Sequence, residues 1–168
     1  MVNNSTNIAQ RAGFLRRLAA MVYDTLIAIA IAVLSGLVIV SILAVLMSQN
    51  VIPNFGYEHL SESIQASIVL QLLVQLWMVF WVVLFYLWFW KHGGQTLGMR
   101  AWRLRMYTLN PEQAMGYWRL FIRLILAFGG LGTLLVLFDY KNKQSLQDRL
   151  SGTEVLFLSK EENHHKSW

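Results

Sequence analysis

The sequence contains no cysteine and few charged residues. Without cysteine, the chain cannot form a disulfide framework, a zinc ribbon or a thiol nucleophile. Only 14% of its 168 residues are charged and 56% are hydrophobic, whereas about 25% of residues are charged in a typical soluble domain. So few charges cannot solvate the surface of a small globule, because a small domain has a large surface for its volume. The composition therefore predicts one domain embedded in a membrane.

Charged side chains are absent from three stretches, at residues 25–57, 63–90 and 124–138. The hydrocarbon core of a bilayer is about 30 Å thick and is crossed by about 20 helical residues. We therefore expect two long transmembrane helices, at about residues 13–47 and 61–90. The first apolar stretch is much longer than the core of a signal peptide and no Ala-x-Ala cleavage site closes it, so we expect it to be retained.

Lysine and arginine are concentrated in the segments that flank one end of these two helices. Residues 1–24 and 91–123 are net positive, whereas residues 48–62 contain no lysine or arginine. Because basic flanks stay in the cytoplasm, we expect the N-terminus and residues 91–123 to lie there and residues 48–62 to lie outside.

The third uncharged stretch, within residues 115–138, allows two arrangements. A single transmembrane helix would carry Gly129, Gly130 and Gly132 in its interior, where glycine is unfavourable. The alternative is a re-entrant or interfacial hairpin, which returns the C-terminus to the cytoplasm and needs protein to cover its irregular backbone. We favour the hairpin because its basic flanks then all lie on one side of the membrane.

Outside the helices, polar and apolar residues alternate at 102–107, which predicts a short strand after a glycine-rich turn at 93–98. Glu112 is expected to open the next helix. The expected fold class is an all-α membrane protein with two long transmembrane helices, a third transmembrane helix or re-entrant hairpin, and a short cytoplasmic β segment. This membrane domain would occupy residues 13–158, between two disordered tails, at 1–12 and 159–168.

Basic and aromatic side chains are interleaved after the second helix, a pattern that suits nucleic acid or anionic lipid. Between membrane segments the lipid headgroups are the nearer partner, at about 1 kcal/mol per charge. We therefore expect lipid contacts, and no nucleic acid, from four residues: Lys91, Arg100, Arg103 and Arg105. The eight aromatic residues within 77–90 are interpreted as a belt at the membrane interface rather than a ligand cage.

Two charged residues near the start of the first helix are candidates for a functional site. Asp24 follows Arg17 by seven residues, or two helical turns, so the two lie nearly on one face. A carboxylate at the edge of a bilayer is costly and pairs with a cation or faces water. The pair is either a structural ion pair or a proton or cation site. Gln71 and Gln75, four residues apart on the second helix, either bond to the first helix or line a polar path.

Other groups of reactive side chains indicate little chemistry. Glu58, His59 and Glu62 could hold a divalent metal, but a solvated loop is the favoured interpretation. No pattern pairs a nucleophile with a general base, because His92 is the only histidine near the cytoplasmic half. We therefore expect no enzymatic activity, no metal site and no cofactor.

Three segments occur in a recognisable order: AGFLRRLAAMVYD at residues 12–24, GQTLGMR at 94–100 and QSLQDRLSGT at 144–153. Together they resemble the motifs of the RDD family of bacterial membrane proteins over roughly residues 12–157. Two positions depart from the family pattern, since Gln147 stands where histidine is common and Met99 where lysine is common.

The resemblance implies that Arg17, Asp24 and Asp148 are the arginine and two aspartates of the family, gathered near the cytoplasmic face. Family members are mostly described as transporters, with sodium/proton exchange suggested for some. The expected function is ion or small-solute transport across the bacterial inner membrane, including cation/proton exchange. Two or three spans are few for a transporter, so a homo-oligomer is expected. The alternative is a non-transporting scaffold or accessory protein that binds partner subunits or lipids.

Overall fold

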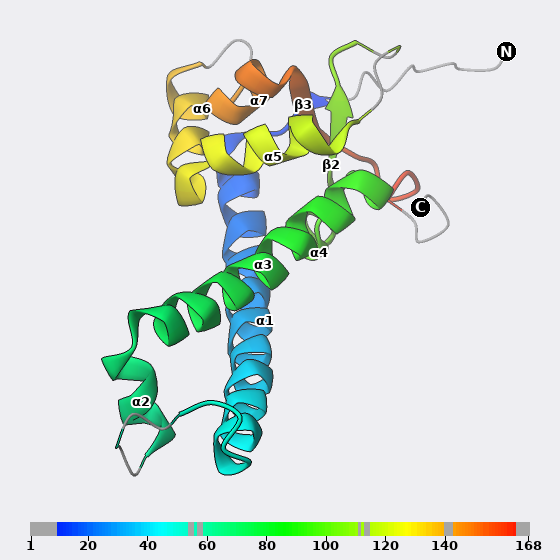
Figure 1. Cartoon of the computed structure of the whole chain (residues 1–168). Helices are drawn as coiled ribbons and strands as arrows, with labels where there is room; N and C mark the ends of the chain where they lie inside the picture. Colours follow the sequence, from blue (N-terminus) through cyan, green and yellow to red (C-terminus); the bar gives the residue numbers. More distant parts are fainter. Residues whose placement is uncertain are drawn as a thin grey trace, which may run out of the picture. The chain divides into compact units, whose positions relative to one another are not determined.

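The computed structural model describes residues 10–53, 56, 59–110, 112, 115–139 and 143–163. The chain forms two compact units (Figure 1). Unit 1 joins Met1–Thr25 to Tyr86–Trp168, and unit 2 is Leu26–Phe85. Two helices contribute to both units, α1 (Phe14–Ser48) and α3 (Ile68–Gly93).

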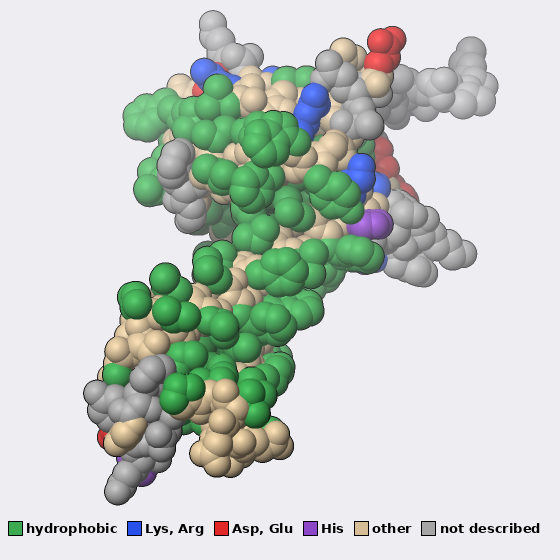
Figure 2. Space-filling model, in the orientation of Figure 1, with side chains coloured by type: hydrophobic (Ala, Val, Ile, Leu, Met, Phe, Trp, Pro, Cys, Tyr) green, Lys and Arg blue, Asp and Glu red, His purple; other side chains and the backbone are tan. Residues whose placement is uncertain are grey.

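The two long helices confirm the expected membrane architecture. Both α1 and α3 are long and apolar enough to cross a bilayer. Large apolar side chains along them are exposed in the isolated chain, as a lipid-facing surface requires: Leu26, Leu34, Leu37, Leu72 and Leu76. On the face drawn in Figure 2, apolar side chains cover the helices, and the visible lysine and arginine side chains lie over unit 1.

Unit 2 shows that the second expected helix is broken near its start. A short helix, α2 (Leu60–Ala66), ends at Ser67, whose backbone is extended, and α3 begins at the next residue. The Ser67 hydroxyl accepts a hydrogen bond from the backbone N–H of Leu70 at 3.5 Å, as a serine does when it caps a helix start. Within unit 2, the Trp77 indole N–H donates to the carbonyl of Ser35 at 3.0 Å.

The third apolar stretch is bent rather than straight. Helix α5 (Tyr117–Leu126) is followed by a 3-10 helix, η1 (Phe128–Leu134), and by α6 (Leu135–Phe138). The axes of Tyr117–Leu126 and Gly130–Phe138 differ by 81°. Gly130 has a φ of +109°, a backbone conformation that glycine adopts without strain. The helix expected to open at Glu112 begins instead at Tyr117, and Gln113 and Ala114 lie outside the described residues.

Unit 1 contains a three-stranded antiparallel sheet in the order β1-β3-β2. Strand β1 (Gln10–Arg11) precedes α1, β2 (Leu104–Thr108) follows α3, and β3 (Thr153–Phe157) lies near the C-terminus. The expected strand therefore exists, and it pairs along its whole length with β3. Alternate residues of these strands enter the core of unit 1 with the buried side chains Leu120 and Trp90: Leu104, Met106 and Val155.

The two expected tails are only partly described. Residues 1–9 and 164–168 lie outside the described residues. Gln10 and Arg11 form β1, and the next residue, Ala12, is buried in the core of unit 1. Near the other end, Asn163 bonds to Gln95 and to the carbonyl of Arg100.

In the glycine-rich segment expected as one turn, only residues 94–96 lie outside helices. Helix α3 extends to Gly93, and a short helix, α4 (Leu97–Ala101), begins after its cap Thr96. The position of Gly98 in this helix requires glycine, because the backbone of α1 approaches it closely. A Cβ atom there would meet the carbonyl oxygen of Ala20 and would lie 2.8 Å from the carboxylate carbon of Asp24.

Gly98→Ala is expected to lower the free energy of unfolding by about 1–3 kcal/mol, the usual cost of overpacking. The measurement is thermal unfolding of the purified protein in detergent, followed by tryptophan fluorescence. Gly36→Ala is the control, since its new Cβ would meet only the flexible side chain of Met78, at 3.3 Å from the sulfur. Equal melting temperatures for the two variants would contradict the close approach at Gly98.

Candidate functional site

The carboxylate of Asp148 is completely buried in unit 1. It lies in α7 (Leu146–Ser151), and the local sequence sets its position. The hydroxyl of Ser145 accepts from the backbone N–H of Asp148, and the Asp148 carboxylate accepts from the N–H of Ser145 at 3.1 Å. This reciprocal capping box anchors the carboxylate at the start of the helix.

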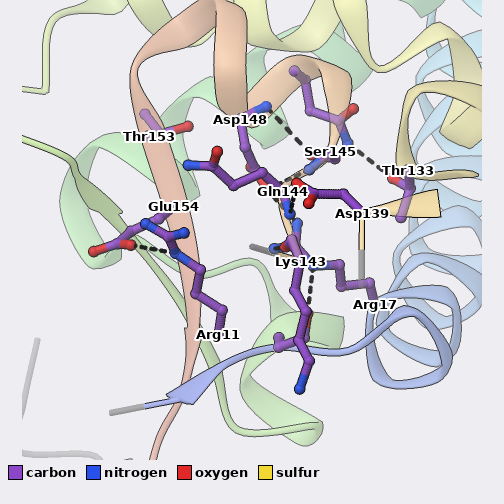
Figure 3. Close-up of polar contacts among 12 residues, drawn as sticks. Arg11, Arg17, Thr133, Asp139, Lys143, Gln144, Ser145, Asp148, Thr153 and Glu154 are labelled. Atoms are coloured by element: carbon purple, nitrogen blue, oxygen red, sulfur yellow. Dashed lines mark hydrogen bonds and ion pairs between the residues drawn. The ribbon is translucent and has the colours of Figure 1, made fainter. Parts of the chain in front are cut away.

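Two arginines from different helices bind this one carboxylate. Arg17 of α1 donates from Nη1 to one oxygen at 2.6 Å, and Arg123 of α5 donates from Nη1 to the other at 2.5 Å. All three side chains are at least nine-tenths buried. Figure 3 shows Arg17 beside the segment that carries Ser145 and Asp148. Asp148 therefore connects α1, α5 and α7.

Fixed polar groups make further hydrogen bonds with both guanidiniums. Arg17 donates from Nε to the carbonyl of Ala12 at 3.0 Å and from Nη2 to that of Lys143 at 3.1 Å. Arg123 donates from Nη1 to the hydroxyl of Thr153 at 2.6 Å. These bonds orient both arginines toward the N-terminal strand, α7 and β3.

Charge keeps Asp148 ionised at neutral pH. Burial alone would raise the pKa of this carboxyl, but the positive charges of Arg123 and Arg17 and the hydrogen bonds from Arg123 and from the backbone N–H of Ser145 lower it to about 2. Two guanidiniums and one carboxylate leave one net positive charge in this buried cluster.

Asp24 is buried nearby but is not part of this cluster. Its two oxygens accept from the hydroxyl of Thr96 at 2.5 Å and from the backbone N–H of Gly98 at 2.8 Å. Within the described part of the chain its carboxylate makes no ion pair. The ion pair expected between Arg17 and Asp24 is therefore absent there, because Arg17 points toward Asp148 instead.

Arg17 and Asp24 nevertheless line one cavity, of about 200 Å³ in unit 1. The other lining residues with polar side-chain atoms are Thr25, Tyr86, Trp90, Arg123, Thr133 and Gln147. The sequence led us to expect two carboxylates sharing one arginine. The structure has two arginines sharing Asp148, with Asp24 held separately by neutral donors.

Arg123 is the functional candidate that sequence reasoning missed. The sequence analysis counted it only in the net charge of residues 91–123, yet its side chain is buried. One signal was available: α5 is strongly amphipathic, with Trp118, Phe121 and Ile125 exposed, so an arginine off that face lies inward.

The remaining sequence candidates lie elsewhere. Gln71 donates to the carbonyl of Gln65 at 2.6 Å, and Gln75 is exposed on α3. Their proposed polar path remains a prediction. Of the three residues considered as metal ligands and interpreted as a solvated loop, Glu58 lies outside the described residues, and no three potential ligands cluster among the residues that are described.

The four residues expected to contact lipid have protein partners as well. Lys91 donates to the carbonyl of Met115 at 2.7 Å. The guanidinium carbons of Arg103 and Arg105 lie 5.1 Å and 5.9 Å from the ring centroids of Phe157 and Tyr107, and Arg100 accepts through its carbonyl from Asn163. Lipid contact by these residues remains a prediction.

Comparison with known proteins gives one match. The model of the RDD family matches residues 11–152, which is most of the chain. No curated protein and no solved structure gives a significant match.

Asp148→Asn is expected to lower the free energy of unfolding by about 3–5 kcal/mol, because it leaves two buried guanidiniums without their carboxylate. The matched control is Asp139→Asn, which removes a pair with the half-exposed Arg149 and should cost about 0–1 kcal/mol. Chemical or thermal unfolding in detergent measures both. Equal losses would contradict the role of Asp148.

The pH dependence gives a second readout for the same pair of variants. The pKa of Asp148 is lowered from 3.8 to about 2 in the folded protein. Its stabilising contribution is therefore fully present above about pH 4 and is lost as the pH falls toward 2, which amounts to about 2 kcal/mol. Asp148→Asn should lose this part of the acid sensitivity, and Asp139→Asn should retain it.

Proposed function

This chain belongs to the RDD family, and from that membership we propose that it is a multi-pass membrane transporter of ions or small solutes. Its two apolar helices, α1 and α3, place it in a membrane. We take the polar cavity of unit 1 as the solute site, near the cytoplasmic face.

The observation that carries this proposal is the state of Asp24. Its carboxylate is 4% exposed, lines the cavity and is held by a hydroxyl and a backbone N–H rather than by a cation. A buried charge is costly unless it is compensated. A carboxylate kept only for structure would have a cationic partner, as Asp148 has. Asp24 is thus available to a proton or a cation that enters the cavity.

The β-sheet supports a topology with both termini in the cytoplasm. Strand β1 precedes α1, β2 follows α3, and β3 follows the bent segment, yet all three belong to one sheet. Strands of one sheet lie on one side of a membrane, so an even number of crossings separates β2 from β3. Helix α5 has ten residues, or about 15 Å, which is half of a bilayer core. A re-entrant or interfacial hairpin fits both facts.

Positive charge supports the orientation. Residues 91–123 hold six cations and one anion, and basic loops remain in the cytoplasm. We therefore assign unit 1 to the cytoplasmic side of a bacterial inner membrane. Two spans and a hairpin enclose little volume in one chain, so we propose that a homo-oligomer completes the transport path.

The topology is tested by cysteine labelling, since the chain has no native cysteine. Lys160→Cys, at an exposed position near the C-terminus, should resist a membrane-impermeant reagent on intact cells and react after lysis. Ser61→Cys, exposed on α2, is the positive control and should react on intact cells. Labelling of Lys160→Cys from outside would contradict the hairpin and favour three full spans.

Transport is tested in proteoliposomes under sodium, lithium and proton gradients. Asp24→Asn is expected to abolish cation-coupled flux, because an amide neither carries charge nor exchanges a proton. Asp139→Asn, at a residue that does not line the cavity, should leave flux unchanged. Flux that persists in folded Asp24→Asn, or its absence in the wild type under every gradient, would contradict the proposal and favour a scaffold that binds subunits or lipids.

A further inference from the structure

Two buried hydrogen-bond donors in the cavity wall have no partner among the described residues. They are the indole N–H of Trp90 and the Nε–H of Arg123. Both side chains are more than nine-tenths buried and line the same cavity. Buried donors are nearly always satisfied, and leaving one unsatisfied costs free energy. These two groups therefore indicate an acceptor that occupies the cavity.

The two donors lie close together, and their charge defines the acceptor. The guanidinium carbon of Arg123 is 5.7 Å from the ring centroid of Trp90. Arg123 also belongs to the pair of arginines that share only Asp148, so this wall carries the excess positive charge. A charged oxygen group that accepts two bonds fits here, and a carboxylate has that chemistry.

The cavity lining also contains hydrogen-bond acceptors, which require a ligand group that donates. Asp24 brings a carboxylate with no ion pair in the described part of the chain, and each of its oxygens has room for a further bond. The side-chain oxygen of Gln147 also lacks a partner among the described residues, while its Nε2 donates to Thr133 at 2.8 Å. An ammonium group supplies donors and positive charge for such acceptors.

Charge balance favours one ligand that carries both groups. Arg17 and Arg123 offset Asp24 and Asp148, so these four lining and cluster residues have no net charge. A simple anion would leave Asp24 uncompensated, and a simple cation would leave the arginine wall uncompensated. A zwitterion compensates both without adding charge to a buried site.

The size and the apolar lining limit the skeleton of the ligand. The cavity holds about 200 Å³, and an apolar cavity of about 150 Å³ accommodates benzene. Apolar side chains form much of the remaining wall: Ala20, Met21, Leu104, Leu124 and Val155. The space suits a molecule with a few carbon atoms.

We propose that this cavity binds a small zwitterion, with its carboxylate on Trp90 and Arg123 and its ammonium group on Asp24. The inference names the solute class for the site given under the proposed function, and it rests on that function only for the choice of cavity. Binding is measured apart from transport, so the two can fail separately.

The test is equilibrium binding to the purified full-length protein in detergent, followed by tryptophan fluorescence and by the shift in melting temperature. The probes are L-alanine, propionate and ethylammonium, which are respectively a zwitterion, an anion and a cation of similar size. L-alanine should bind saturably and at least about tenfold more tightly than either single-charge probe, as expected when a charged hydrogen bond is lost. β-Alanine, which has one more carbon between its charged groups than L-alanine, is a further arm that reports the charge separation that fits best.

Trp90→Phe tests the donor wall, because it removes the indole N–H and keeps an aromatic ring. It should weaken L-alanine binding by about three- to tenfold, the equivalent of one hydrogen bond. Trp118→Phe is the matched control, since Trp118 is 74% exposed on α5 and does not line the cavity. Asp24→Asn should abolish the preference for L-alanine over propionate.

Each outcome decides one of the two proposals. Saturable L-alanine binding that depends on Trp90 and Asp24, without flux, would support the ligand class and contradict transport. Cation-coupled flux with no preference for L-alanine over propionate and ethylammonium would overturn the ligand class and leave transport standing. Equal binding by Trp90→Phe and Trp118→Phe would also overturn the ligand assignment.

Discussion

The carboxylate of Asp148 accepts from the guanidiniums of Arg17 and Arg123, and the arrangement of unit 1 depends on this shared contact. A buried ion network contributes less net stability than its short distances suggest, because three groups must be desolvated. The network does favour one arrangement of the helices, since any packing that separates α1, α5 and α7 leaves a buried charge without its partner. The cavity wall is positively charged because two guanidiniums share this one carboxylate.

The long helices and the middle strand could be predicted because their signals are local. Absence of charge over residues 25–57 and 63–90 is enough to predict a span, and alternation is enough to predict β2. Strands β1 and β3 were missed because their pairing joins residues more than 140 positions apart, such as Gln10 and Phe157. Neither segment alternates over a length that stands out in the sequence.

The candidate site was predictable in its members but not in its contacts. Helical geometry correctly places Arg17 and Asp24 near one face, yet it says nothing about which neighbours cross that face. Thr96 and Gly98, about seventy positions later, donate hydrogen bonds to Asp24. Arg17 donates to Asp148, which lies 131 positions away. The family resemblance supplied Asp148, while the inward position of Arg123 had only the amphipathic pattern of α5 to indicate it.

The order β1-β3-β2 has a consequence for how the protein is made. The central strand is the last of the three to leave the ribosome, so neither outer strand has a partner until residues 153–157 have been made. Arg17 also lacks its partner Asp148 until 131 more residues have been synthesised. At usual synthesis rates this takes roughly 7 to 26 seconds. A chain truncated before α7 therefore lacks both the central strand of the sheet and the carboxylate that neutralises Arg17.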